Sequence, residues 1–162
     1  MKILKYISKI LSLILVFFLL FLSCTYAYDK NFNKINQNYN VKLEIFDNDK
    51  KIHEFRVAIA DNDEKRSYGL MNLRRLGVKK GMLFIFNEPA IINMWMKNTL
   101  IPLDMIFIND KNEIVKIEEY TKPQNLDIIS SQKLVDKVLE INAGLSKKYN
   151  IKPGQKIKFD LK

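Results

Sequence analysis

Hydrophobic and polar residues alternate with a period of two along much of the chain after residue 40, and this alternation predicts β-strands with one buried face. Other segments are apolar without interruption, which predicts strands buried on both faces. Together, strands are expected at residues 41–45, 53–59, 82–86, 91–96, 103–108, 113–120, 135–142 and 157–161. Short strands at this spacing predict a mainly β (α+β) fold, a single compact antiparallel β-barrel-like domain with short helices.

Caps and turns separate these strands. Asp61 followed by Glu64 has the spacing of a capping box and predicts a short helix that runs toward Met71 or Leu76. The segment Asn-Glu-Pro at residues 87–89 predicts a turn between two strands. Strands that follow one another in the chain usually lie side by side in a sheet. The loop after Trp95 and the start of the strand at 103–108 are therefore expected at the same end of the sheet.

The N-terminal segment has a different pattern. Three lysines precede a run over residues 10–22 that is apolar apart from one serine. This arrangement is typical of a secretory signal peptide, since a transmembrane helix needs about 20 apolar residues. We expect a signal peptide over residues 1–24 with cleavage after residue 23 or 27, a flexible polar tether over 25–40, and a β-rich globular domain over 41–162.

Cys24 is the only cysteine, so the domain contains no internal disulfide. Residues 21–24 (Phe-Leu-Ser-Cys) approximate a lipobox, which makes Cys24 a candidate for lipidation. Residues 25–27 (Thr-Tyr-Ala) offer an ordinary signal-peptidase site instead. Both alternatives predict export to the periplasm or cell envelope. The membrane would then be contacted only through the signal segment or a lipid anchor.

Composition excludes several classes of function. The chain has 27 Lys and Arg against 18 Asp and Glu, but the basic residues are dispersed among acidic ones. This favours a solvated surface, so we expect no nucleic-acid partner. With one histidine and one cysteine, the chain cannot build a His- or Cys-clustered metal site. It also has no phosphate- or dinucleotide-binding motif. We therefore expect neither a metal nor a cofactor.

Polar side chains that could do chemistry gather in and near residues 95–104. Lys97, Asn98 and Thr99 directly follow the only tryptophan, Trp95, and Asp104 interrupts an apolar run. A charge buried without a partner costs several kcal/mol, so these residues need a structural or functional reason. The candidate ligand-binding residues are Arg66, Trp95, Lys97, Asn98, Thr99 and Asp104, and the candidate catalytic carboxyls are Asp104 and Glu140. The apolar surroundings predict that Trp95 is largely buried.

Three hypotheses account for these residues. In the first, Asp104 accepts backbone N–H groups of the 98–100 loop, Lys97 neutralises it, and Arg66 pairs with Glu140. In the second, Trp95 stacks on a small ligand, such as a sugar or a peptide-like envelope fragment. In the third, an Asp104/Glu140 pair acts as acid and base in a hydrolase of a glycan or similar envelope polymer. We favour a small-ligand-binding or structural module of the envelope over an enzyme, with an unknown small molecule or envelope component as its partner.

Four motifs resemble those of a widespread prokaryotic family, the domain-of-unknown-function family 192. They are GLM at residues 69–71, GMLFIF at 81–86, WMKNTLIPLD at 95–104 and LEINAG at 139–144. The resemblance covers roughly residues 41–159. Met94 stands where the family usually has phenylalanine, and Asn112 and Gln155 replace a common glycine and aspartate at turns. The resemblance implies a compact, β-rich single domain that is often exported and has no established activity.

Overall fold

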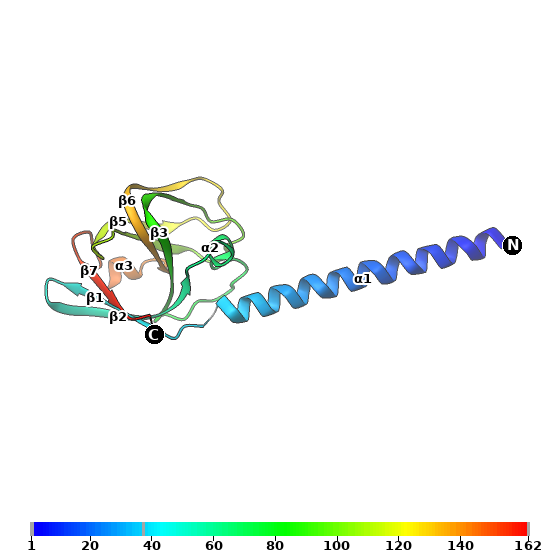
Figure 1. Cartoon of the computed structure of the whole chain (residues 1–162), viewed down its shortest axis with the longest axis horizontal. Helices are drawn as coiled ribbons and strands as arrows, with labels where there is room; N and C mark the ends of the chain where they lie inside the picture. The colour runs from blue at the N-terminus through cyan, green and yellow to red at the C-terminus, as the bar shows by residue number, and fades with distance from the viewer. Residues whose placement is uncertain (1, 37, 162) are drawn as a thin grey trace. The chain divides into compact units, whose positions relative to one another are not determined.

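The computed structural model of the protein describes residues 2–36 and 38–161, with side chains for residues 7, 9–26 and 38–161. It separates into two units, residues 1–37 and residues 38–162. The first unit is the helix α1 (Lys2–Asn36) and the second is a β-rich domain (Figure 1).

Helix α1 contains an exposed apolar stretch, Lys9–Tyr26, with a mean hydropathy of 2.2. This stretch is long and apolar enough to cross a membrane, and signal sequences have the same properties. It is therefore consistent with the predicted signal peptide. Cys24 lies in this stretch with an exposed, unbridged thiol. The helix extends to Asn36, into the segment where a flexible tether is expected, and residues 28–36 contain no glycine or proline that would end it.

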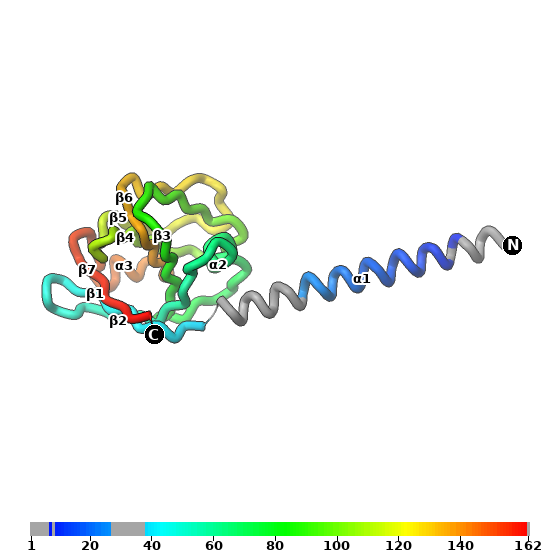
Figure 2. The backbone as a smooth tube through the Cα atoms, viewed as in Figure 1, coloured from blue at the N-terminus to red at the C-terminus, as the bar shows by residue number. Residues whose placement is uncertain are grey.

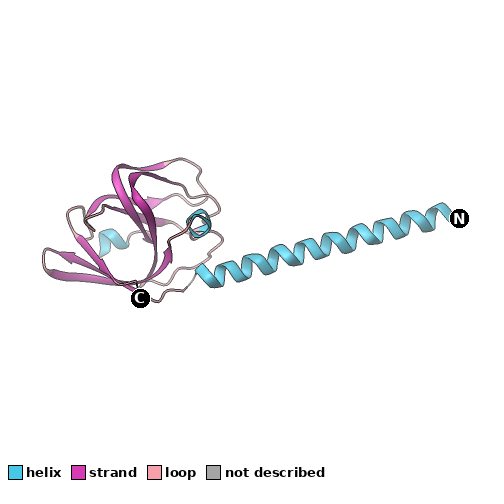
Figure 3. Ribbon diagram, in the orientation of Figure 1, coloured by secondary structure: helices cyan, strands magenta, loops and turns pink. Residues whose placement is uncertain are grey.

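The second unit consists of seven strands and two short helices. In chain order these are β1 (Val41–Asp47), β2 (Lys50–Ala60), α2 (Asp63–Tyr68), β3 (Lys80–Met94), β4 (Leu103–Ile108), β5 (Ile114–Thr121), β6 (Ile129–Asn142), α3 (Leu145–Lys148) and β7 (Lys156–Phe159). The strands form one sheet in the order β5-β4-β6-β3-β2-β1-β7. This sheet curls strongly into a half-barrel (Figure 3), and a bridge between Glu113 and Lys156 joins its two edges. The predicted mainly β, barrel-like single domain is confirmed.

Three details differ from the sequence-based expectations. One strand pair, β2–β3, is parallel. Residues 80–94 form one long strand, because the Asn-Glu-Pro segment is accommodated as an irregularity between Ile85 and Ala90 where the pairing with β6 shifts register. Strand β6 lies between β3 and β4 and runs beside β3 for most of its length (Figure 2). The ends of β3 and β4 are therefore separated by a strand that comes later in the chain.

The central strands are buried on both faces, as their continuous apolar runs predict. All six residues of β4 are buried. One face of the sheet packs in a cluster that includes Ile106, Ile108 and Leu139, and the other face packs in a cluster that includes Met105 and Phe107. Successive side chains of a strand point to opposite faces, so a polar residue in one of these strands must lie in one cluster or the other.

Gly81 allows β3 and β6 to approach closely beside Glu140. A Cβ atom at residue 81 would lie 2.7 Å from the backbone oxygen of Glu140, a distance that requires the strands to move. We expect Gly81→Ala to lower the free energy of unfolding by about 2 kcal/mol, the usual cost of overpacking. Gly77→Ala is the matched control, because its Cβ would meet only the flexible side chain of Lys80, at 3.3 Å. Equal losses for both variants in urea unfolding would contradict this account of the β3–β6 contact.

Candidate functional site

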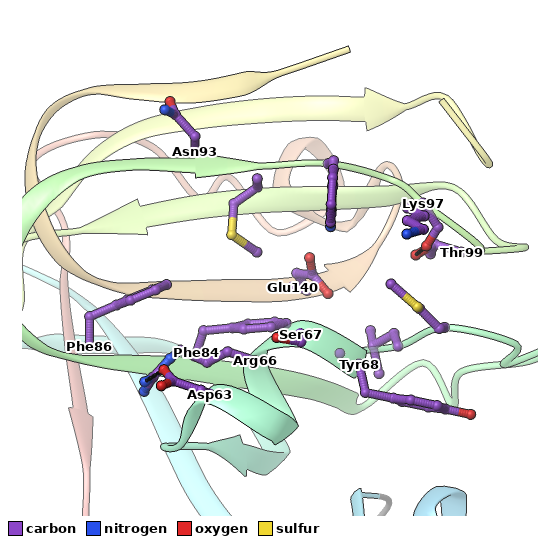
Figure 4. A pocket seen from close by; sticks show the side chains of 15 residues that line it. Asp63, Arg66, Ser67, Tyr68, Phe84, Phe86, Asn93, Lys97, Thr99 and Glu140 are labelled. Carbon is purple, nitrogen blue, oxygen red and sulfur yellow. Dashed lines mark hydrogen bonds and ion pairs between the residues drawn. The ribbon is translucent and has the colours of Figure 1, made fainter. Parts of the chain in front are cut away.

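A cavity of about 340 Å³ lies beside α2, with walls from α2, β3, the loop that follows β3, and β6 (Figure 4). Its lining combines aromatic rings, methionines and a few charged groups. The lining residues of α2 and the segment after it are Asp63, Arg66, Ser67, Tyr68, Gly69, Leu70 and Met71. Those of β3, its following loop and β6 are Phe84, Phe86, Asn93, Met94, Trp95, Lys97, Thr99 and Glu140.

Helix α2 begins at an asparagine cap and ends at a glycine that packs close to β3. Its N-cap is Asn62, whose side-chain oxygen accepts a hydrogen bond from the backbone N–H of Lys65 at 2.9 Å. This corrects the predicted Asp61 cap. The helix ends at Gly69, which has a φ of +51° that a glycine adopts without strain. A Cβ there would lie 3.1 Å from the ring of Phe84, so the glycine also lets the chain pack on the wall of the cavity.

Arg66 is fixed along one wall of the cavity. Its guanidinium donates to the backbone oxygen of Ile85 at 2.7 Å and to the carboxylate of Asp63 at 2.5 Å, and it lies 5.3 Å from the centre of the Phe86 ring. The expected pair between Arg66 and Glu140 is therefore not formed, although both residues line the cavity. The reason is proximity along the chain: Asp63 lies one helical turn before Arg66 and provides the nearer carboxylate.

Trp95 stands at the mouth of the cavity and not in the core. It is 50% exposed, so the prediction of a largely buried tryptophan is wrong. The neighbouring Met96 is fully buried instead, because side chains alternate around this point of the chain. The ammonium group of Lys97 lies 5.2 Å from the centre of the Trp95 ring, a cation–π distance. Lys97 forms no ion pair with any described residue.

The exposure of Trp95 leads to a prediction. We expect Trp95→Ala to change the free energy of unfolding by about 1 kcal/mol or less, because a half-exposed side chain leaves no closed void. As the only tryptophan, Trp95 should show the red-shifted fluorescence emission of a solvated indole in the folded protein. A blue-shifted emission maximum, together with a loss of several kcal/mol on truncation, would place it in the core after all.

The loop after Trp95 is ordered by backbone hydrogen bonds. The Thr99 N–H donates to Met96, the Thr99 carbonyl accepts from Gln124, and the Asn98 carbonyl accepts from Asn72. Asn98 takes a φ of +52°, which asparagine tolerates better than most residues. Thr99 is buried and lines the cavity, whereas the side chain of Asn98 points to the surface near Met71 and is not part of the lining.

Glu140 is the buried carboxyl of the cavity. It lies in β6 opposite Met82 of β3 and Met105 of β4, and it is only 4% exposed. Figure 4 shows it in the middle of the cavity, between α2 and the Lys97–Thr99 segment. No side-chain hydrogen bond or ion pair joins it to another described residue. Burial without a counter-charge raises the pKa of Glu140 to about 8, so the carboxyl is mostly protonated at neutral pH.

Asp104 has a different environment. Its two carboxylate oxygens accept hydrogen bonds from the backbone N–H groups of Tyr120 at 3.0 Å, Gly144 at 3.0 Å and Ser146 at 2.9 Å. The expected donors were the N–H groups of the 98–100 loop and Lys97. Tyr120 belongs to β5, which pairs directly with β4, and Gly144 and Ser146 come from the segment that follows β6, the other neighbour of β4.

Asp104 and Glu140 point to opposite faces of the sheet. Glu140 pairs with Met105, so it shares the face of Met105, while Asp104, one residue earlier, lies on the other face. Accordingly, Asp104 does not line the cavity. The structure thus does not bring together the two carboxyls that an acid/base pair would need at one substrate.

Of the residues predicted for the site, Arg66, Trp95, Lys97 and Thr99 line the same cavity as Glu140, whereas Asn98 and Asp104 do not. Sequence reasoning missed the aromatic walls, Tyr68, Phe84 and Phe86. Phe84 and Phe86 are two residues apart in one strand and so share a face, which is a signal that the sequence does contain. The contribution of Tyr68 depends on where α2 packs, and no local pattern predicts that.

Comparison with known proteins identifies a family and a fold. The sequence profile of DUF192, described as "Uncharacterized ACR, COG1430", matches residues 44–159. A solved structure from Sinorhizobium meliloti 1021, provisionally described as a transcription regulator, is similar with a TM-score of 0.71 and 36% identity, over 74% of this chain and 92% of that one. A protein of unknown function from Novosphingobium aromaticivorans DSM 12444 is similar with a TM-score of 0.69 and 32% identity, over 72% and 83% of the two chains. A search of the curated proteins found no match.

Proposed function

The chain belongs to the DUF192 family, whose description assigns no activity, and we propose from the cavity itself that it is an exported small-ligand-binding module of the cell envelope. The observation that carries this proposal is Glu140, a buried carboxyl that faces a cavity and has no side-chain partner among the described residues. A polar group left unpaired inside a protein costs free energy. A ligand that pairs with Glu140 offsets this cost.

The size and composition of the cavity support the same function. Its volume of about 340 Å³ is at the lower end of the range of small-molecule sites, roughly 300–1,000 Å³. Aromatic walls with a few convergent polar groups are typical of such sites. The half-exposed Trp95 offers a ring on which a sugar or a peptide-like fragment could stack at the mouth, with Lys97 beside it.

Ligand binding is tested by NMR chemical shifts with four probes: N-acetylglucosamine, muramyl dipeptide, the dipeptide alanylalanine and acetate. We expect at least one probe to shift the Trp95 indole N–H and the Thr99 amide. The variant Ser67→Phe, which fills the cavity, should abolish those shifts. Glu88→Phe places the same ring on an exposed part of β3 outside the cavity and should leave them unchanged. If millimolar concentrations of every probe leave the Trp95 indole and Thr99 amide resonances unshifted, the binding function is contradicted.

The N-terminal segment supports export. An exposed apolar stretch preceded by lysines is the pattern of a signal peptide. We expect the intact mass of the mature protein from the envelope fraction to correspond to cleavage after residue 23, with a lipid on Cys24, or after residue 27 without a lipid. The full-length mass in the cytoplasmic fraction would contradict export.

A further inference from the structure

The charged side chains that line the cavity form two groups. Asp63 and Arg66 pair with each other at 2.5 Å. Lys97 and Glu140 have no ion-pair partner among the described residues. One of these unpaired groups is basic and lies at the mouth, while the other is acidic and is buried. A ligand that satisfies both must carry a positive and a negative charge.

We propose that the cavity binds a small zwitterion whose ammonium group pairs with the carboxylate of Glu140 and whose own carboxylate pairs with the ammonium group of Lys97. This is the chemistry of an amino acid or a dipeptide. The inference rests on the proposed ligand-binding function and names the class of ligand.

The surroundings of Glu140 favour a cation. Its neighbours on the adjacent strands, Met82 and Met105, are uncharged and provide no donor for a carboxylate. The walls of the cavity include Tyr68 and Phe84, and aromatic faces attract an ammonium group. A ligand cation thus provides the counter-charge that the fold itself does not provide.

The position of Lys97 favours an anion at the mouth. Its ammonium group is exposed, lies over the Trp95 ring and is free of carboxylate partners among the residues that the structure describes. Arg66 is less available, because Asp63 and the Ile85 carbonyl already accept from its guanidinium. The exposed carboxylate of Asp63 also repels an anion from the α2 side of the cavity. A ligand carboxylate is therefore directed to Lys97.

The number of protons released on binding depends on the protonation state of Glu140 before the ligand binds. The charged or titratable groups that share the cavity with Glu140 are Asp63, Arg66, Tyr68 and Lys97. Burial raises the pKa of Glu140 to about 8, so at pH 7 the carboxyl holds its proton. An incoming ammonium group forms its ion pair only after this proton leaves for the buffer. Each binding event at pH 7 should then release about one proton.

The test is calorimetric titration of the protein with alanylalanine at pH 7 in two buffers of different ionisation enthalpy. We expect binding with the release of about one proton per dipeptide. N-acetylation of the dipeptide removes its ammonium group and amidation removes its carboxylate. Each modification should weaken binding on the order of 100-fold, the usual effect of truncating one member of a desolvated charge pair.

Two variants assign these contacts. Glu140→Gln keeps the shape of the side chain and should abolish both the proton release and the preference for the dipeptide over its N-acetyl form. Lys97→Met should abolish the preference for the dipeptide over its amide, while the proton release remains. Unchanged thermal unfolding cooperativity would establish that both variants are folded.

Three results would overturn the inference. The first is binding of alanylalanine without proton release, and the second is binding of alanylalanine by Glu140→Gln with the affinity of the wild type. The third is a shift of the Trp95 indole N–H and the Thr99 amide with N-acetylglucosamine but not with the dipeptide. The last result leaves the ligand-binding function intact and removes only the zwitterion. If no probe reaches the cavity, the function and the inference fail together.

Discussion

Glu140→Gln is expected to stabilise the protein at pH 7, by about 3 kcal/mol. The reason is a difference in pKa between the two states. The carboxyl has a pKa of about 8 in the folded protein against an ordinary value of 4.5. Below the ordinary value both states are protonated. Between the two values the unfolded state gains free energy by ionising while the folded state does not, so wild-type stability falls by about 1.4 kcal/mol per pH unit. Glutamine does not titrate and avoids this loss.

Urea unfolding at pH 4 and pH 7 measures this effect. Wild type and Glu140→Gln should have nearly equal free energies of unfolding at pH 4 and should diverge as the pH rises. Glu119→Gln is the control, because Glu119 is exposed and outside the cavity and should show no such divergence. If Glu140→Gln is instead less stable than wild type at pH 7, the carboxylate is engaged in a stabilising interaction and the description of the cavity is incorrect.

The second large effect is expected at Asp104. Asp104→Ala should lower the free energy of unfolding by about 4 kcal/mol, because three backbone N–H groups lose a charged acceptor in the core, at a cost of about 1.5–3 kcal/mol for each such bond before non-additivity. Asp104→Asn should cost less, since the amide keeps one accepting oxygen in the same shape. Urea unfolding of the two variants tests whether Asp104 stabilises the fold through these backbone hydrogen bonds. Asp104→Ala should be less stable than Asp104→Asn.

A double-mutant cycle separates this role from the ion pair suggested by the sequence. No hydrogen bond or ion pair joins Asp104 to Lys97 among the described residues. The stability losses of Asp104→Asn and Lys97→Met should therefore add to within about 0.5 kcal/mol. A coupling energy well above this value would mean that the two residues interact, contrary to the structure.

Periodicity predicted most of the strands because the buried and exposed faces of a sheet impose a period of two on the sequence. The six residues of β4 are all buried, and the sequence shows them as an apolar run that only Asp104 interrupts. Asp104 was correctly expected to need donors. The identity of those donors could not be predicted. Tyr120 comes from β5, the next strand in the chain, whereas Gly144 and Ser146 reach Asp104 only because β6 enters the sheet beside β4. Pairing over such sequence distances leaves no local pattern.

The cavity was only partly predictable for a related reason. The sequence singled out Glu140 as a candidate carboxyl, and the polar residues of the WMKNTLIPLD motif singled out Trp95 and Lys97. That these residues share one cavity depends on how α2 packs, which is a tertiary contact. The local interaction of Arg66 with Asp63, one helical turn away, likewise replaced the predicted long-range pair with Glu140.

The titration of Glu140 tests the central claim most directly. The measurement is the ¹³C chemical shift of its side-chain carboxyl as a function of pH, with the signal assigned by its loss in Glu140→Gln. A buried, unpartnered carboxyl predicts a midpoint near pH 8 in the folded, ligand-free protein. A midpoint at the ordinary value of about 4.5 would mean that the carboxyl is solvated or paired, and would contradict the proposed site.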